Sequence, residues 1–141
     1  MRGQKCSAAS RIYVHASISD KFLKALRERA EKMVVGDPRE KPVFMGPVMN
    51  KSVVEKFIGE VAEAKKGGGV VLTSGDVLNS GIFKTGFYLQ PTIIIGLPAS
   101  NRLFRDELFI PLVVVDKFKT FEETIAKVND TNYGLTAGIF T

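Results

Sequence analysis

Residues 11–33 read RIYVHASISDKFLKALRERAEKM, and they set the fold class because they join a strand pattern to a helix pattern. Residues 11–15 are rich in β-branched and aromatic side chains, as strands are. After Ser17, the expected N-cap, apolar residues recur at helical spacing, and Asp20 lies in the first turn. Gly36-Asp37-Pro38 is expected to end this helix. A strand that leads into a helix is the repeating unit of α/β proteins.

The next part of the chain repeats this alternation. Asn50 is expected to cap a second helix, whose apolar face includes Ile58 and which the three glycines at 67–69 end. Residues 70–73 then predict a buried strand. The glycines follow a helix and show no GxGxxG spacing, so they favour a helix stop over a phosphate-binding loop.

The last third continues the pattern less regularly. Strands are predicted at 88–95 (interrupted by Pro91), 112–115 and 135–141, with a loop or irregular hairpin at 75–86. Residues 98–109 are expected to lie outside the core because they are polar and irregular. Thr120 and Glu123 form a capping box for a helix to about Val128. This order predicts an α/β fold with an open, mostly parallel sheet flanked by helices.

Composition excludes several classes of protein. The chain has 141 residues, which is one domain. Its net charge of +5 is scattered, with no basic run longer than Lys65-Lys66, so no nucleic-acid partner is expected. One Cys and one His exclude a disulfide framework and a tetrahedral zinc site, so no metal is expected. No apolar run is long enough for a membrane helix or a signal peptide, and we expect a cytoplasmic protein with a reduced thiol.

Two segments could carry chemistry. A lone cysteine such as Cys6 is usually a buried apolar residue, but small polar neighbours and the adjacent Lys5 favour a thiolate. Residues 7–10 could form a helical turn whose amides hold an oxyanion. Asp106 and Glu107 precede a buried strand, where they are either solvated carboxylates or partners for a ribose hydroxyl. His15 is expected at the surface and not as a base.

The stretch around Cys6 resembles a known family. Residues 3–11, GQKCSAASR, are similar to the cysteine motif of the aldehyde dehydrogenase superfamily. The resemblance continues in order through 35–38, 45–48, 86–92, 106–109 and 129–138, and so covers essentially the whole chain. The Gln-Lys-Cys-Ser version resembles the delta-1-pyrroline-5-carboxylate dehydrogenase type, which oxidises glutamate semialdehyde to glutamate. The resemblance implies a partial catalytic domain at 1–141, with the cofactor-binding domain and the C-terminal portion absent.

The same resemblance implies a role for each matched residue. Cys6 would be the nucleophile that attacks a small aldehyde substrate, and its backbone amide would share the oxyanion with an asparagine side chain. Glu107 would hold the nicotinamide ribose of NAD or NADP, and Phe109 would pack near the ring. Ser7 would bond the distal carboxylate of the substrate. The general-base Glu and the oxyanion Asn belong to the absent domain, so we expect no aldehyde oxidation by this chain alone.

Position 110 departs from the family pattern Glu-x-Phe-Gly-Pro, because Ile110 stands in place of Gly. A β-branched residue does not readily take a positive φ, and we expect it to crowd the nicotinamide pocket. Both ends look cut, since the last predicted strand stops at Thr141 and Cys6 lies near the start. Three hypotheses follow: an inactive fragment, half of a split enzyme with a complementary cofactor-domain chain, or a non-enzymatic remnant that binds a partner. The expected partner is either a second copy, in a homo-oligomer that covers the exposed strand edge and apolar surface, or the complementary cofactor-domain chain.

Overall fold

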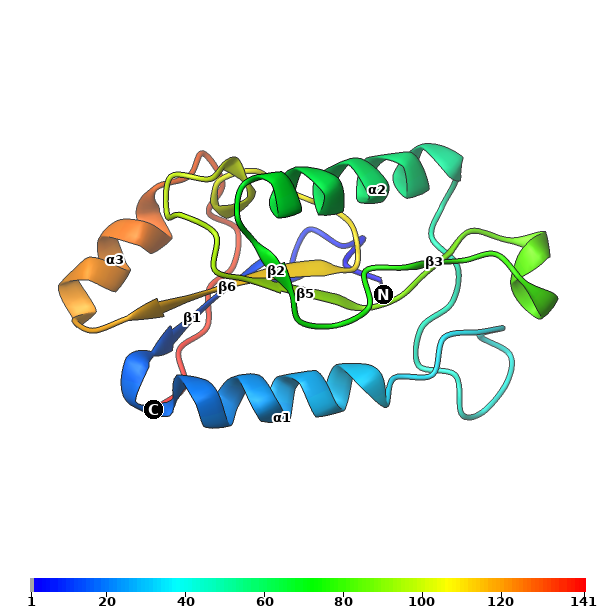
Figure 1. The fold of residues 1–141 in the computed structure, drawn as a ribbon, viewed down its shortest axis with the longest axis horizontal. Helices are drawn as coiled ribbons and strands as arrows, with labels where there is room; N and C mark the ends of the chain where they lie inside the picture. The colour runs from blue at the N-terminus through cyan, green and yellow to red at the C-terminus, as the bar shows by residue number, and fades with distance from the viewer. Residues whose placement is uncertain (1) are drawn as a thin grey trace.

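The computed structural model describes residues 2–141 and shows an α/β fold (Figure 1). The helices are α1 (Ser19–Glu31), α2 (Lys51–Lys66) and α3 (Phe121–Asn129), with short 3-10 turns η1 (Ala16–Ile18), η2 (Gly81–Thr85) and η3 (Arg102–Phe104). The strands are β1 (Arg11–His15), β2 (Val70–Val71), β3 (Val77–Leu78), β4 (Tyr88–Leu89), β5 (Thr92–Ile95) and β6 (Leu112–Phe118). None of the helices in this part of the chain is long and apolar enough to cross a membrane.

The main sheet has four strands in the order β1-β6-β5-β2, which confirms the predicted open, mostly parallel sheet. β6 is central and pairs in parallel with β1 and with β5, whereas β2 runs antiparallel at the edge. Arg11 stands opposite Val114, and Thr92 stands opposite Leu112. The segments that precede β1 and β6 therefore lie side by side at the end of the sheet where these two parallel strands begin. A separate two-stranded sheet joins β3 to β4.

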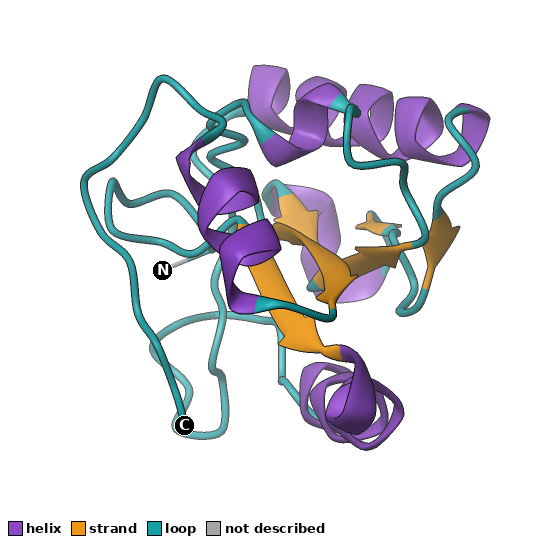
Figure 2. Ribbon diagram, turned by 90° about the vertical axis from the view of Figure 1, so that its left-hand side faces the viewer, coloured by secondary structure: helices purple, strands orange, loops and turns teal. Residues whose placement is uncertain are grey.

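Helices cover both faces of the sheet (Figures 1 and 2). Ile94 and Val114 point towards α2, where Phe57 belongs to the same buried cluster. Their neighbours Ile93 and Val115 belong to the second cluster, which α1 covers. Because successive side chains of a strand point to opposite faces, apolar runs in β5 and β6 are buried on both sides. This double burial explains the runs of β-branched residues at 92–95 and 113–115.

The first helix begins and ends differently from the prediction. Its N-cap is Ile18, because Ser17 lies in η1 and donates its backbone N–H to His15 Nδ1 (3.2 Å). The helix ends at Glu31, well before Gly36, one residue after Ala30, its last buried residue. The glycine therefore does not fix the end of this helix.

Two predictions in the middle of the chain are wrong in detail. The strand predicted at 70–73 comprises only Val70–Val71, and Val70 is 57% exposed because it lies in the edge strand. Ile58 does not belong to the buried face of α2 either. Phe57, Val61 and Ala64 are spaced by four and three residues and define that face, which leaves Ile58 about 100° around the helix.

Two predictions in the last third are also wrong. The segment at 98–109 contributes Leu103, Phe104 and Leu108 to the core, because η3 folds this irregular stretch over α2's side of the sheet. The strand predicted at 135–141 is not formed. Within residues 2–141 no strand lies beside it, so its backbone has no ladder to join, and Phe140 is 99% exposed. The capping box is confirmed at α3, where Thr120 Oγ1 accepts from Glu123 N (3.3 Å).

Candidate active site

The cysteine loop, residues 3–10, carries Cys6 on the surface just before β1. Cys6 and Ser7 are both exposed. The predicted helical turn at 7–10 is not formed: the backbone makes one turn, closed by Ala8 N donating to Lys5 O (2.9 Å), and then extends into β1. A single hydrogen-bonded turn is too short to propagate as a helix. The thiol therefore has open access, without a helix N-terminus beneath it.

Residues 105–110, which the resemblance links to a cofactor ribose and which are called the ribose segment below, lie just before β6. Glu107 is exposed, and its backbone carbonyl accepts a hydrogen bond from Lys56 Nζ (3.3 Å). Phe109 is half-buried and has φ of 58°, a left-handed conformation that is uncommon for a bulky residue. Such strain persists only where surrounding contacts enforce it, and it clusters at functional sites.

Ile110 is buried at the position where the family pattern has Gly. The positive φ falls on Phe109 and not on Ile110, and the Ile110 side chain is only 3% exposed within the core cluster under α2. The Ile110 side chain is thus directed into the core of this chain, and crowding of the nicotinamide pocket stays a prediction. The buried Ile110 side chain anchors the ribose segment to the core.

Pairing of parallel strands brings the cysteine loop and the ribose segment together. β1 and β6 are neighbours and begin at the same end of the sheet, so the residues that precede them meet there. Gly3 makes the contact: a Cβ built on it would overlap the Ile110 carbonyl oxygen and stand 2.7 Å from the carbonyl carbon. Ligands of doubly wound sheets bind outside the C-terminal ends of the parallel strands. This site lies at their N-terminal ends and is therefore not a crevice of that kind.

An ion-pair cluster, which sequence reasoning missed, fixes the start of the ribose segment to α2. Arg102 binds Glu60 through Nη2 (2.6 Å), Glu63 through Nε (2.8 Å) and Asp106 through Nη1 (3.0 Å). The hydrogen bond with Glu63 is the largest of the contacts that raise the pKa of the Arg102 guanidinium. Glu60 and Glu63 lie 42 and 39 positions before Arg102 in the sequence, so helical spacing gives no signal for these two pairs.

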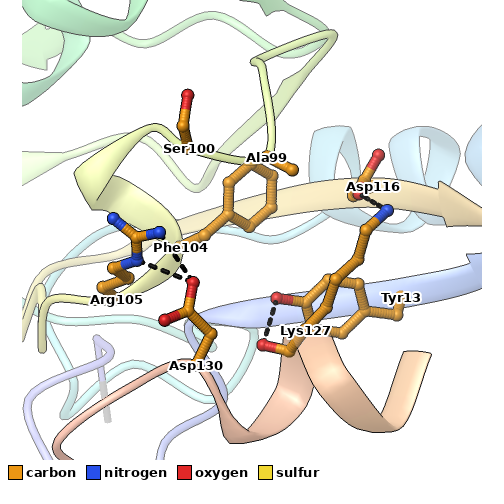
Figure 3. A pocket seen from close by; sticks show the side chains of 8 residues that line it. All are labelled: Tyr13, Ala99, Ser100, Phe104, Arg105, Asp116, Lys127 and Asp130. Atoms are coloured by element: carbon orange, nitrogen blue, oxygen red, sulfur yellow. Dashed lines mark hydrogen bonds and ion pairs between the residues drawn. The ribbon is translucent and has the colours of Figure 1, made fainter. Parts of the chain in front are cut away.

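A separate small pocket lies between η3, the sheet and α3 (Figure 3). Its volume is about 190 Å³, and it is lined by Tyr13, Ala99, Ser100, Phe104, Arg105, Asp116, Lys127 and Asp130. Its charges satisfy one another, because Lys127 pairs with Asp116 (2.7 Å) and Arg105 pairs with Asp130 (2.7 Å). None of the residues that the sequence singled out for catalysis lines it. Across residues 2–141 no three His, Cys, Asp or Glu side chains gather as metal ligands would.

Comparison with known proteins gives consistent matches. The model of the aldehyde dehydrogenase family matches residues 1–141. The chain is 37% identical to betaine aldehyde dehydrogenase of Mesorhizobium japonicum, with 99% of this chain and 28% of the relative covered. It is also 37% identical to alpha-aminoadipic semialdehyde dehydrogenase of Bos taurus, with 99% of this chain and 25% of the relative covered.

Solved structures agree in fold. Betaine aldehyde dehydrogenase of Staphylococcus aureus in complex with NAD+ superposes with a TM-score of 0.91 at 36% identity, over 95% of this chain and 27% of that one. An aldehyde dehydrogenase of Bacillus cereus gives 0.92 at 32% identity, over 99% and 28%. The chain thus spans little more than a quarter of the proteins it matches. It belongs to the aldehyde dehydrogenase family.

Proposed function

We propose that this chain supplies the nucleophile and part of the cofactor site of an NAD(P)-dependent aldehyde dehydrogenase. The nucleotide-binding domain, with the general base, comes from another stretch of polypeptide or a complementary chain. One observation carries the proposal: an exposed thiol and an exposed carboxylate belong to two segments that touch at Gly3 and Ile110. A nucleophile must be reachable by substrate, and Cys6 meets that requirement.

The chemistry assigned to this chain begins at Cys6. Its thiolate attacks the carbonyl carbon of the aldehyde, so that a C–S bond forms and the carbonyl oxygen becomes an oxyanion. The backbone N–H of Cys6 donates to that oxygen. Loss of hydride leaves a thioester on Cys6, and water then releases the carboxylic acid and restores the thiol.

The cofactor site rests on the ribose segment. Glu107 offers an exposed carboxylate, an acceptor suited to ribose hydroxyls, and its main chain is held by Lys56. Phe109, two residues later, is half-buried, and an aromatic ring is a group suited to contact a planar nicotinamide. A bound nicotinamide cofactor supplies the hydride acceptor. These residues fit such a group, and we propose that they hold NAD or NADP when the second domain is present.

For the substrate we propose glutamate semialdehyde, an aldehyde with a distal carboxylate. Ser7 supports this choice because it is exposed and directly follows the thiol, so its hydroxyl can donate to a carboxylate. Lys5, also exposed, adds a positive charge on the other side of Cys6. One of the relatives is an alpha-aminoadipic semialdehyde dehydrogenase and another a betaine aldehyde dehydrogenase. The test therefore compares glutamate semialdehyde with betaine aldehyde.

A chimera tests the activity directly. This chain replaces the matched 139-residue segment of the Mesorhizobium japonicum relative, which then provides the rest of the enzyme. We expect aldehyde-dependent NADH formation that Cys6→Ala abolishes, while the isolated chain forms none. A folded chimera that forms no NADH with glutamate semialdehyde or betaine aldehyde contradicts the proposal. Within an active chimera, Ser7→Ala should raise the KM for glutamate semialdehyde and leave the KM for betaine aldehyde unchanged.

A further inference from the structure

The cysteine loop makes few contacts of its own near the thiol. The turn around Cys6 is closed by one backbone hydrogen bond, from Ala8 N to Lys5 O, and residues 5–9 are all exposed. A short exposed turn of this kind samples several conformations unless its ends are fixed. The position of the thiol therefore depends on what holds the residues just before it.

Gly3 is the first fixed point. Its φ is +70°, a conformation that favours glycine, and its Cα lies against the main chain of Ile110. Any side chain here would overlap the Ile110 carbonyl oxygen. Cys6 follows three residues later, so its Cα lies within about 11 Å of this contact. Backbone packing at Gly3 thus limits how far the thiol can move from the ribose segment.

Gln4 is the second fixed point. Its side-chain Oε1 accepts a hydrogen bond from Met49 N (3.1 Å), in the loop that leads into α2. Its Nε2 is buried and has no hydrogen-bond partner among residues 2–141. A buried donor without a partner lowers stability, so the contact of Gln4 with the described residues is made by its acceptor oxygen alone. This bond ties the residue two positions before Cys6 to the loop that precedes α2.

Both fixed points connect to the elements that hold Glu107. Met49 precedes Asn50, whose side chain caps α2 by accepting from Val53 N (3.2 Å). The same helix carries Lys56, which bonds the Glu107 carbonyl. Gly3 touches Ile110, three residues beyond Glu107. Two independent contacts, one at Gly3 and one at Gln4, therefore connect the segment that carries the thiol to the elements that hold Glu107.

We propose that Gly3 and Gln4 are positioning residues, which touch no reacting atom and fix the Cys6 thiol relative to Glu107. The proposal rests on the function proposed above for Cys6 and Glu107. Loss of one hydrogen bond of this kind shifts the ratio of anchored to free loop by about 2–10-fold. The displacement should be measurable in this chain without any cofactor or activity.

The single cysteine makes the measurement direct, because a nitroxide label attaches only at Cys6. Paramagnetic broadening of backbone amides then reports their distance from position 6. We expect broadening at Ile110 and at Met49, which weakens at Ile110 in Gly3→Ala and at Met49 in Gln4→Leu. Gln4→Glu keeps the acceptor and should retain the broadening at Met49.

Gly59→Ala is the matched control, because a Cβ at Gly59 meets nothing within 4 Å. It should leave every broadening unchanged. If Gly3→Ala fails to fold, the pair of Gln4 variants decides. Wild-type broadening at Met49 in Gln4→Leu, or equal loss in Gln4→Glu, overturns the proposal.

Failure of the proposed function looks different. In an active chimera, Gln4→Leu should lower kcat and leave the KM for NAD unchanged, since Glu107 keeps its own supports, and Gln4→Glu should restore kcat. An inactive chimera with the broadening pattern intact rejects the proposed function alone. If the chimera is active and Gln4→Leu changes neither its kcat nor the broadening at Met49, the positioning role alone is rejected.

Discussion

The two segments that meet at the candidate site are held in opposite ways. The ribose segment follows η3, whose Leu103 is fully buried, and it is clamped to α2 by Arg102. The cysteine loop buries none of residues 5–9 and relies on Gly3 and Gln4. One segment is part of the core, whereas the other leans on it. Substitutions in the two segments should therefore separate stability from site geometry.

The largest effect is expected at Leu108, which is 1% exposed and lies beside Glu107 in the sequence. Leu108→Ala should lower the free energy of unfolding by about 2–5 kcal/mol, because it leaves a cavity in the cluster under α2. Leu108→Met, which conserves volume, should cost less than about 1.5 kcal/mol. Urea unfolding measures both. If Leu108→Ala lowers the free energy of unfolding by less than Leu108→Met does, the ribose segment is not part of the core.

The next largest effect concerns the ion-pair cluster. Glu60→Gln should cost about 1–3 kcal/mol, since the Glu60 side chain is only 8% exposed and loses a charge-assisted bond to Arg102. Glu63→Gln is the control: this side chain is 43% exposed, and solvent screens its pair, so the cost should stay below about 1 kcal/mol. Equal losses in the two variants would mean that burial does not decide the strength of this cluster.

A smaller effect is expected at Asn50, which links the two segments through α2. Asn50→Ala removes the N-cap of this helix and should cost about 1 kcal/mol. Asn50→Asp keeps an acceptor oxygen, and its negative charge suits the helix N-terminus, so it should retain the stability. Thermal or urea unfolding of the three proteins checks the order. An Asp variant as unstable as the Ala variant would contradict the capping role.

The cysteine loop itself should respond least in stability. Ser7→Ala and Cys6→Ala change exposed side chains and should shift the free energy of unfolding by no more than about 0.5 kcal/mol. A loss of several times this size would show that the cysteine loop, like the ribose segment, is part of the core. Chemical denaturation at matched protein concentrations gives the answer.

The last effect is local and depends on pH. Arg39 donates side-chain and backbone hydrogen bonds to Asp37 and lowers the pKa of that carboxyl from 3.8 to about 2. Because the folded-state pKa is depressed, the pair contributes stability above the ordinary pKa and loses it as pH falls towards about 2. NMR titration of Asp37 should show this low midpoint, and Arg39→Gln should return it towards 3.8. An unchanged midpoint in the variant would contradict the cause.

Local patterns predicted what local chemistry controls. The strand at 11–15 and the caps at Asn50 and Thr120 follow from side chains acting on their own backbone, and the structure confirms them. The prediction for 98–109 is wrong because Leu103, Phe104 and Leu108, which are buried in the core, are scattered among polar residues and form no periodic pattern. The strand at 135–141 failed because a strand needs a neighbour, which sequence periodicity cannot supply.

The sequence by itself determined the alternation of strands and helices, the family resemblance and the identity of the candidate residues, because these depend on residue types and short spacings. Tertiary structure alone decided that the thiol is exposed, that Ile110 turns inwards and that Gly3 meets Ile110. Those facts depend on which strands pair, and Gly3 and Ile110 lie 107 positions apart in the sequence. Contacts over such separations arise from burial of the whole sheet between its helices.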